Sequence, residues 1–77
     1  MDGVTLDTLE PGQRGRILRI KGAGEISKRI ADMGLVRGTT IEVERVAPLG
    51  DPVEFRIKGY HLSLRKGEAQ NIWVERF

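Results

Sequence analysis

Cysteine is absent from this 77-residue chain, and histidine occurs once, as His61. Without cysteine the chain cannot form a disulfide, a thiolate metal site or a cysteine nucleophile. The two serines, Ser27 and Ser63, have only one imidazole that could act as their base. Three carboxylates alternate with apolar residues along predicted strands, as solvent-facing side chains do; they are Glu42, Glu44 and Glu54. We therefore expect no enzyme activity.

The single histidine also limits metal binding. A non-haem iron site uses two histidines and a carboxylate, and a structural zinc site uses four N or S ligands. A site shared between chains, with two copies of His61, is the one metal site we consider. Gly22-x-Gly24 is similar to half of a phosphate-binding loop, but Glu25 would repel a phosphate at the start of the following helix. No cofactor is expected.

Aromatic residues are scarce as well. One tryptophan, one tyrosine and two phenylalanines offer few surfaces for base stacking, and a net charge of +2 attracts nucleic acid weakly. Nucleic-acid binding by a small barrel is therefore an alternative and not the main hypothesis. The basic residues cluster locally, and we interpret both clusters as ordinary solvated strand faces. They are Arg14, Arg16, Arg19 and Lys21, and Arg56, Lys58, Arg65 and Lys66.

Long apolar runs are missing too. No run reaches the roughly 18 residues of a membrane-spanning helix, and the first ten residues are acidic and polar where a signal peptide would be basic and then apolar. We expect a soluble, cytoplasmic chain without direct membrane insertion.

A short helix over residues 25–33 is the most specific local pattern that is present. Apolar residues fall at positions i, i+4 and i+7 of this segment, which is typical of one buried helical stripe. Gly34 can adopt the left-handed conformation that ends a helix, and Leu35 would then pack on Ile30, as in a Schellman cap. A further single helical turn is expected over residues 5–10.

Most of the remaining chain alternates apolar and polar residues, which indicates half-buried strands. The predicted strands are residues 15–21, 39–46, 53–58, 60–65 and 71–77, with a turn or one helical turn at 66–70. This order predicts a mainly β fold, a small five-stranded closed or partly open barrel with the helix inserted after the first strand. The length predicts a single domain over residues 1–77.

The alternation is imperfect in the first and last strands, so their buried faces are not assigned. The predicted core contains the apolar residues of the helix and of the regular strands. It consists of Leu9, Ile17, Ile26, Ile30, Met33, Leu35, Ile41, Val43, Phe55, Ile57, Leu62, Leu64 and Val74.

Several motifs together resemble one known family. They are MGLVRG at 33–38, APLGDP at 47–52, EFRIKGYHLSLRKGEA at 54–69 and NIWV at 71–74. The chain resembles the FeoA family, small cytosolic accessory proteins of bacterial and archaeal ferrous iron uptake. Two turn positions depart from the family pattern: Arg37 stands where proline is common, and Gly67 stands where a charged residue is common.

The resemblance implies a barrel of the SH3 type with an inserted helical segment, and it implies a partner. That partner is the FeoB-type membrane transporter, with its GTP-binding domain on the cytosolic side. The function implied is that of a non-enzymatic adaptor which binds this region and modulates the transporter. An alternative is a stand-alone relative of the C-terminal barrel domain of metal-dependent repressors.

The surface expected to contact the partner combines the end of the helix with the nearby strand. It consists of Gly34, Leu35, Val36, Arg37, Gly38, Tyr60 and His61. The sequence does not indicate whether the transporter is activated, inhibited or assembled, and the barrel edges leave a homodimer open.

Overall fold

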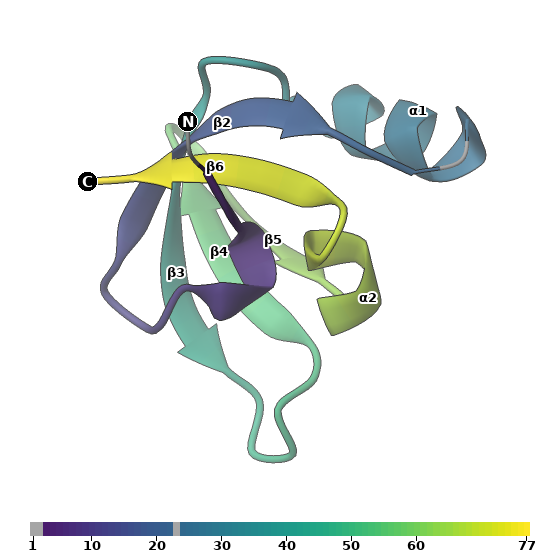
Figure 1. Ribbon diagram of the computed structural model, residues 1–77. Helices are drawn as coiled ribbons and strands as arrows, with labels where there is room; N and C mark the ends of the chain where they lie inside the picture. The colour runs from purple at the N-terminus through teal and green to yellow at the C-terminus, as the bar shows by residue number, and fades with distance from the viewer. Residues whose placement is uncertain (1–2, 23) are drawn as a thin grey trace.

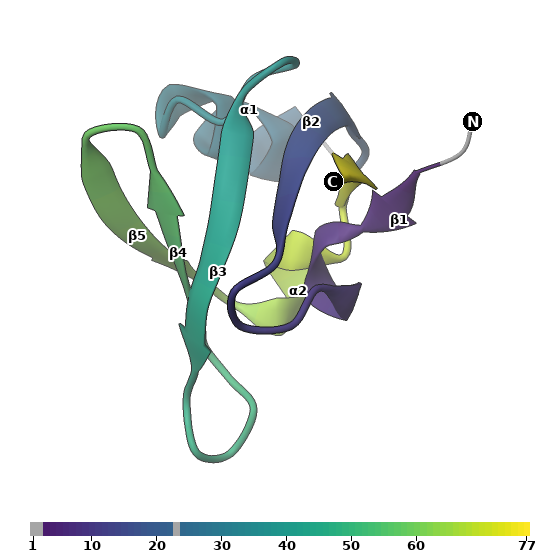
Figure 2. The ribbon, with the colours of Figure 1, turned by 90° about the vertical axis from the view of Figure 1, so that its left-hand side faces the viewer.

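Six antiparallel strands form one strongly curved sheet in the computed structural model, which describes residues 3–22 and 24–77 (Figures 1 and 2). The strand order is β1-β6-β2-β3-β4-β5. The strands are β1 (Val4–Thr5), β2 (Arg14–Ile20), β3 (Thr40–Val46), β4 (Val53–Ile57), β5 (Tyr60–Leu64) and β6 (Ile72–Arg76). The helical segments are the 3-10 helix η1 (Leu6–Thr8) and the α-helices α1 (Gly24–Asp32) and α2 (Lys66–Ala69). The mainly β fold with a helix after the first long strand is confirmed.

The first residues differ from the sequence prediction. A sixth strand, β1, was not predicted, and its Val4 and Thr5 pair with Val74 and Trp73 of β6. The helical turn expected over residues 5–10 shortens to η1. A two-residue strand is too short to produce a visible alternation, so only its pairing with β6 defines it. Within the described residues, no helix is both long and apolar enough to cross a membrane.

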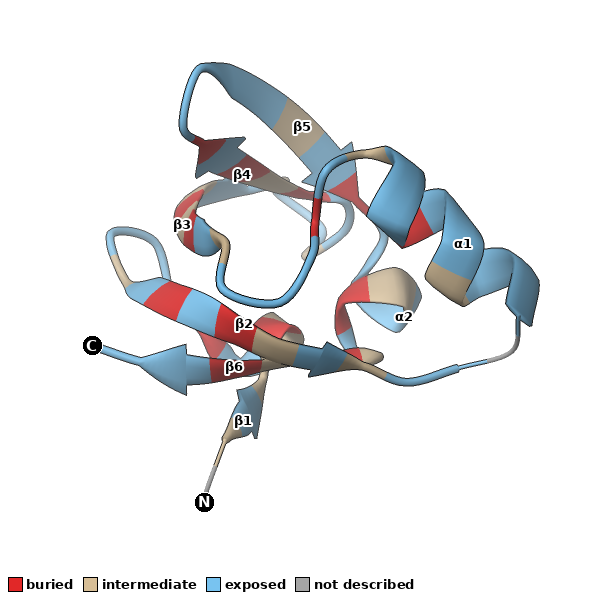
Figure 3. Ribbon diagram, turned by 90° about the horizontal axis from the view of Figure 1, so that it is seen from above, coloured by how far each residue is buried: buried red, intermediate tan, exposed pale blue. Residues whose placement is uncertain are grey.

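The core lies inside the curl of the sheet, and buried residues alternate with more exposed ones along much of β2, β3, β4 and β6 (Figure 3). Phe55 of β4 is the largest completely buried side chain. Most of the predicted core is confirmed, with Met33 and Leu62 only partly buried against it. Four core residues were not predicted: Leu6, Val53, Ala69 and Ile72.

Ile26 was wrongly placed in the core, since it is 38% exposed. The reason is the position of α1, which lies beside the end of β2 and extends away from the sheet (Figure 1). Ile30 is the buried residue of this helix. The apolar stripe of α1 is therefore covered only toward its C-terminal end.

The end of α1 is a complete Schellman cap. Gly34 has a φ of +89°, and its N–H donates to the carbonyl of Ala31 at 2.9 Å. The N–H of Leu35 donates to the carbonyl of Ile30 at 3.3 Å, and both of these side chains are buried in the core cluster. This pair of hydrogen bonds and the apolar contact are the features that define the motif. The predicted Schellman cap at Gly34 and Leu35 is confirmed.

A bulge in β2 explains the imperfect alternation of the first strand. Ile17 pairs with Val74 and Arg19 pairs with Trp73, so the register shifts at Leu18. One extra residue reverses the side to which the following side chains point. Arg19 and Lys21 therefore lie on the same outer side of the sheet as Arg14 and Arg16, where a regular strand would have turned them inward.

Candidate docking surface

The helix end and β5 meet through Tyr60. The Tyr60 hydroxyl donates a hydrogen bond to the carbonyl of Met33, and a Cβ added at Gly34 would lie 2.7 Å from that hydroxyl oxygen. A glycine at position 34 therefore serves two purposes, the left-handed turn and the close approach of the tyrosine. The structure brings together these residues, which are far apart in sequence.

The turn after the helix is fastened to β2. The N–H of Gly38 donates to the carbonyl of Ile17 at 2.8 Å, and the N–H of Ile17 donates to the carbonyl of Thr39 at 2.8 Å. Just before Gly38 in the chain, Val36 is 49% exposed and Arg37 is exposed. We call Val36, Arg37 and Tyr60 the helix-end surface. Because Leu35 is completely buried, it supports this surface from beneath.

His61 lies on the other side of the sheet. Its Nδ1 is 2.7 Å from a carboxylate oxygen of Glu44, whereas its neighbour Tyr60 points toward the helix end. Successive residues of a strand point to opposite faces, so these two side chains belong to different surfaces. Of the seven residues expected from the sequence, Leu35 is buried and His61 belongs to a different face, and the other five are exposed near the helix end.

His61 belongs to an outer surface of paired charges. The β3–β5 face, as we call it, consists of Glu42, Glu44, Arg45, Glu54, Arg56 and His61. Arg45 forms a two-pronged ion pair with Glu54 at 3.1 and 3.2 Å, and Arg56 binds Glu42 at 2.8 Å. Hydrogen bonding to Glu54 and the charge of that carboxylate raise the pKa of Arg45, and Glu42 raises the pKa of Arg56 in the same way.

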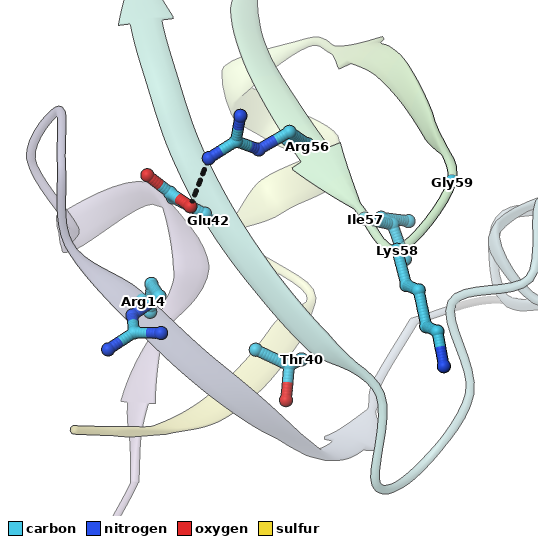
Figure 4. A pocket seen from close by; sticks show the side chains of 7 residues that line it. All are labelled: Arg14, Thr40, Glu42, Arg56, Ile57, Lys58 and Gly59. Carbon is cyan, nitrogen blue, oxygen red and sulfur yellow. Dashed lines mark hydrogen bonds and ion pairs between the residues drawn. The ribbon is translucent and has the colours of Figure 1, made fainter.

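A hollow of about 380 Å³ borders the β3–β5 face. Figure 4 shows the Arg56 guanidinium bound to Glu42 on one side of it, with the side chains of Arg14 and Lys58 pointing away from that pair. Its lining is completed by Thr40, Ile57 and Gly59. Its one carboxylate, Glu42, is bound to Arg56, and a single carboxylate does not form a metal site.

Metal ligands are similarly sparse elsewhere in residues 3–22 and 24–77, where no group of three or more His, Cys, Asp or Glu side chains could hold an ion. His61 and Glu44 provide two ligands at most. The metal site shared between two chains through His61 stays a prediction.

A second outer surface differs in its chemistry. The β2–β6 face, as we call it, consists of Arg14, Arg16, Arg19, Lys21, Trp73, Glu75 and Phe77. Arg14 and Arg16 lie 5.3 and 5.6 Å from the ring centre of Phe77. Arg19 and Lys21 lie 5.3 and 5.6 Å from that of Trp73.

Sequence reasoning found the cations of the β2–β6 face but interpreted them as an ordinary solvated strand. The position of these cations beside Trp73 could not be predicted, because it depends on the bulge at Leu18. The cluster of four cations within eight residues was the available signal.

Comparisons with known proteins agree with this fold. The family model "FeoA domain" matches residues 4–76. A Porphyromonas gingivalis protein named Fe(2+) transport protein A/Fe(2+) transporter FeoB fusion protein is 47% identical over 70 residues, which are 91% of this chain and 8% of that protein. The chain thus spans less than a tenth of the length of this curated relative.

Solved structures give the same result. An FeoA-like protein from Clostridium acetobutylicum is 43% identical with a TM-score of 0.91, covering 97% of this chain and 87% of its own. The FeoA of Stenotrophomonas maltophilia, solved with zinc and described as a procaryotic SH3 domain protein, is 22% identical with a TM-score of 0.82. This similarity covers 94% of this chain and 89% of the other, and it supports the SH3-like fold alone.

Proposed function

Because the chain belongs to the FeoA family, we propose that it is a non-enzymatic accessory protein of ferrous iron uptake. It binds the cytosolic GTP-binding region of a FeoB-type transporter and modulates that transporter. The observation that carries this proposal is the Porphyromonas gingivalis relative, in which a segment 47% identical to this chain is fused to a transporter named FeoB. Fusion of two domains in one chain keeps them at high effective concentration, as expected of partners that bind each other.

The helix-end surface is the part of the molecule that we assign to this contact. Val36 and Tyr60 are among the large apolar side chains that remain exposed, at 49% and 42%, and Arg37 lies beside Val36 in the turn. Arginine and tyrosine are enriched at the energetic centres of interfaces. The hydrogen bonds of Gly34 and Gly38 hold this turn in one shape, so little conformational entropy is lost on binding.

The role proposed for the chain is binding rather than chemistry. The GTP hydrolysis and the ion pathway then belong to the transporter, and the chain acts at its cytoplasmic side. A homodimer through the sheet edges β1 and β5 is compatible with this role, because both strands have one unpaired edge.

The test is calorimetric titration of the purified chain with the soluble GTP-binding region of a FeoB-type transporter, loaded with GDP or with a non-hydrolysable GTP analogue. We expect saturable binding in at least one nucleotide state and a change in the rate of GTP hydrolysis. Val36→Asp and Arg37→Glu should each weaken binding at least about tenfold, the range expected for interface hot spots.

Lys28→Glu is the matched control, since Lys28 is an exposed cation of α1 and its reversal changes the net charge as Arg37→Glu does. His61→Ala should bind like the unmodified chain, because His61 lies on the other side of the sheet. Absence of binding in both nucleotide states and with the full-length transporter would refute the proposal.

A further inference from the structure

The β2–β6 face has an excess of positive charge that the fold has gathered on one side. Four cations from Arg14 to Lys21 follow one strand over about 20 Å. The bulge at Leu18 is responsible, because it turns Arg19 and Lys21 to the side already occupied by Arg14 and Arg16. Bulges that redirect side chains are commonly found next to functional sites.

The positive charge of this face is poorly compensated. In the described part of the chain, Glu75 is the one carboxylate that forms an ion pair with these cations, 3.9 Å from Arg16. Both side chains of that pair are more than half exposed, at 55% and 59%, and such pairs contribute little. The cations are instead arranged over the rings of Trp73 and Phe77, so this face combines positive charge with aromatic surface.

We propose that the β2–β6 face binds the anionic lipid headgroups of a membrane surface. Lysine and arginine near an anionic membrane each contribute about fivefold to binding, and tryptophan prefers the interface between headgroups and acyl chains. This inference rests on the proposed function, because a protein that binds a membrane transporter works next to a bilayer. The β2–β6 face carries both kinds of residue on the outer side of the sheet, where a membrane surface can reach them.

Single-stranded nucleic acid is less well matched to the same residues. Base stacking needs an aromatic ring with an accessible face. Here each ring already has two cations above it at 5.3 to 5.6 Å. The hollow borders this face at Arg14, but its other lining residues come from β3, β4 and the turn after β4, and none of them is aromatic. It therefore offers no further ring on which a base could stack.

The test uses the full chain and lipid vesicles without any transporter, so that its failure and that of the transporter-binding proposal can be distinguished. Trp73 is the single tryptophan of the chain and lies on the face itself, so its fluorescence reports binding directly. Vesicles of phosphatidylcholine with one third phosphatidylglycerol should shift the emission to the blue and carry the protein on sedimentation. Pure phosphatidylcholine vesicles should bind it about a hundredfold more weakly, from three uncompensated cations.

Arg16→Glu/Arg19→Glu should reduce binding to the anionic vesicles at least about 25-fold. The control Lys28→Glu/Lys66→Glu carries the same net charge change on exposed residues elsewhere and should reduce it much less. Arg16→Lys/Arg19→Lys should retain binding, and it keeps the test valid if the reversed variant does not fold by circular dichroism.

Equal binding to neutral and anionic vesicles, or equal loss in the two charge-reversed proteins, would overturn the proposal. So would tighter binding of an oligothymidine strand than of anionic vesicles with the same dependence on Arg16 and Arg19, which would assign the face to single-stranded nucleic acid. Binding of the unmodified chain should also fall steeply between 0.05 and 0.3 M salt, since exposed charges are screened over about 10 Å at 0.1 M.

Discussion

On the β3–β5 face, Arg45 and Arg56 each have a carboxylate within hydrogen-bonding distance. On the β2–β6 face, Arg16 is the one cation of four that forms an ion pair among the described residues, with Glu75 at 3.9 Å. Both are outer faces of the same sheet, and on both faces charged residues alternate with apolar residues along the strands. The paired charges satisfy one another and leave little net field. The cations of the other face retain their attraction for an anionic surface. Whether the charged side chains are paired with opposite charges, more than how many there are, distinguishes a solvated face from a candidate binding face.

The largest effect is expected where the two halves of the sheet are joined. The turn after α1 contacts β5 through the Tyr60 hydrogen bond and β2 through the bond from Gly38 to Ile17. Gly34→Ala forces a left-handed φ on a residue with a Cβ and places that Cβ 2.7 Å from the Tyr60 hydroxyl. We expect a loss of about 2 to 3 kcal/mol in the free energy of unfolding, measured by urea denaturation.

Gly24→Ala is the control for this prediction. Gly24 begins α1, and a Cβ there would meet no atom within 4 Å. The free energy of unfolding of the Gly24→Ala protein should therefore stay unchanged or rise slightly. If Gly34→Ala were as stable as Gly24→Ala, the description of the helix end would be wrong.

The next largest effect on stability is expected from a substitution at the contact between β2 and β6. A Cβ at Gly15 would lie 2.9 Å from both Cβ and Cγ2 of Val74, so Gly15→Ala overpacks the contact between these strands. We expect a destabilisation of about 1 to 3 kcal/mol. Gly67→Ala, in α2 with no atom within 4 Å of the new Cβ, should be neutral or stabilising in the same urea experiment. Equal stabilities would mean that β2 and β6 move apart without cost.

A smaller effect is expected from the aromatic part of the face. Trp73→Leu keeps an apolar residue on β6 but removes the ring beneath Arg19 and Lys21. Exposed cation–π contacts contribute about 0.5 to 1 kcal/mol each, so we expect a loss of about 1 kcal/mol or somewhat more. Leu49→Ala, which truncates a side chain that is 97% exposed, should leave thermal stability unchanged. A Trp73→Leu protein as stable as the Leu49→Ala protein would show that these contacts contribute nothing.

The smallest effect is expected on the paired face. Glu54→Gln removes the carboxylate charge that holds Arg45, but exposed ion pairs are weak and screened by salt. The melting temperature should fall slightly at low ionic strength and should match that of the unmodified chain in 1 M sodium chloride. A large loss that persists in high salt would show that this face is a rigid network, and the contrast between the two faces would fail.

Local features of the fold could be predicted from the sequence, whereas features that depend on distant contacts could not. The Schellman cap needs only Gly34, Leu35 and the preceding turn, so its pattern is contained in a few residues. Ile26 was misplaced because its burial depends on where α1 lies beside the sheet. The buried side of the first strand required the bulge at Leu18, which only the register against β6 reveals.

The same difference between local features and features that depend on distant contacts applies to the candidate site. Tyr60 was correctly associated with the helix end, although 25 residues lie between it and Gly34 in the sequence. The strand periodicity that predicted β5 already implies that Tyr60 and His61 point to opposite sides. His61 was nevertheless grouped with the helix end, and the contact of its Nδ1 with Glu44 places it on the β3–β5 face.

The most direct test of the proposed transporter contact is a ¹H–¹⁵N correlation spectrum of the labelled chain during titration with the GTP-binding region of a FeoB-type transporter. We predict that the largest changes occur at the amides of Val36, Arg37 and Tyr60, with the amides of Glu44 and Arg56 unaffected. Changes centred on the β3–β5 face, or no change at saturating partner concentration, would contradict the assignment of the helix-end surface as the docking site.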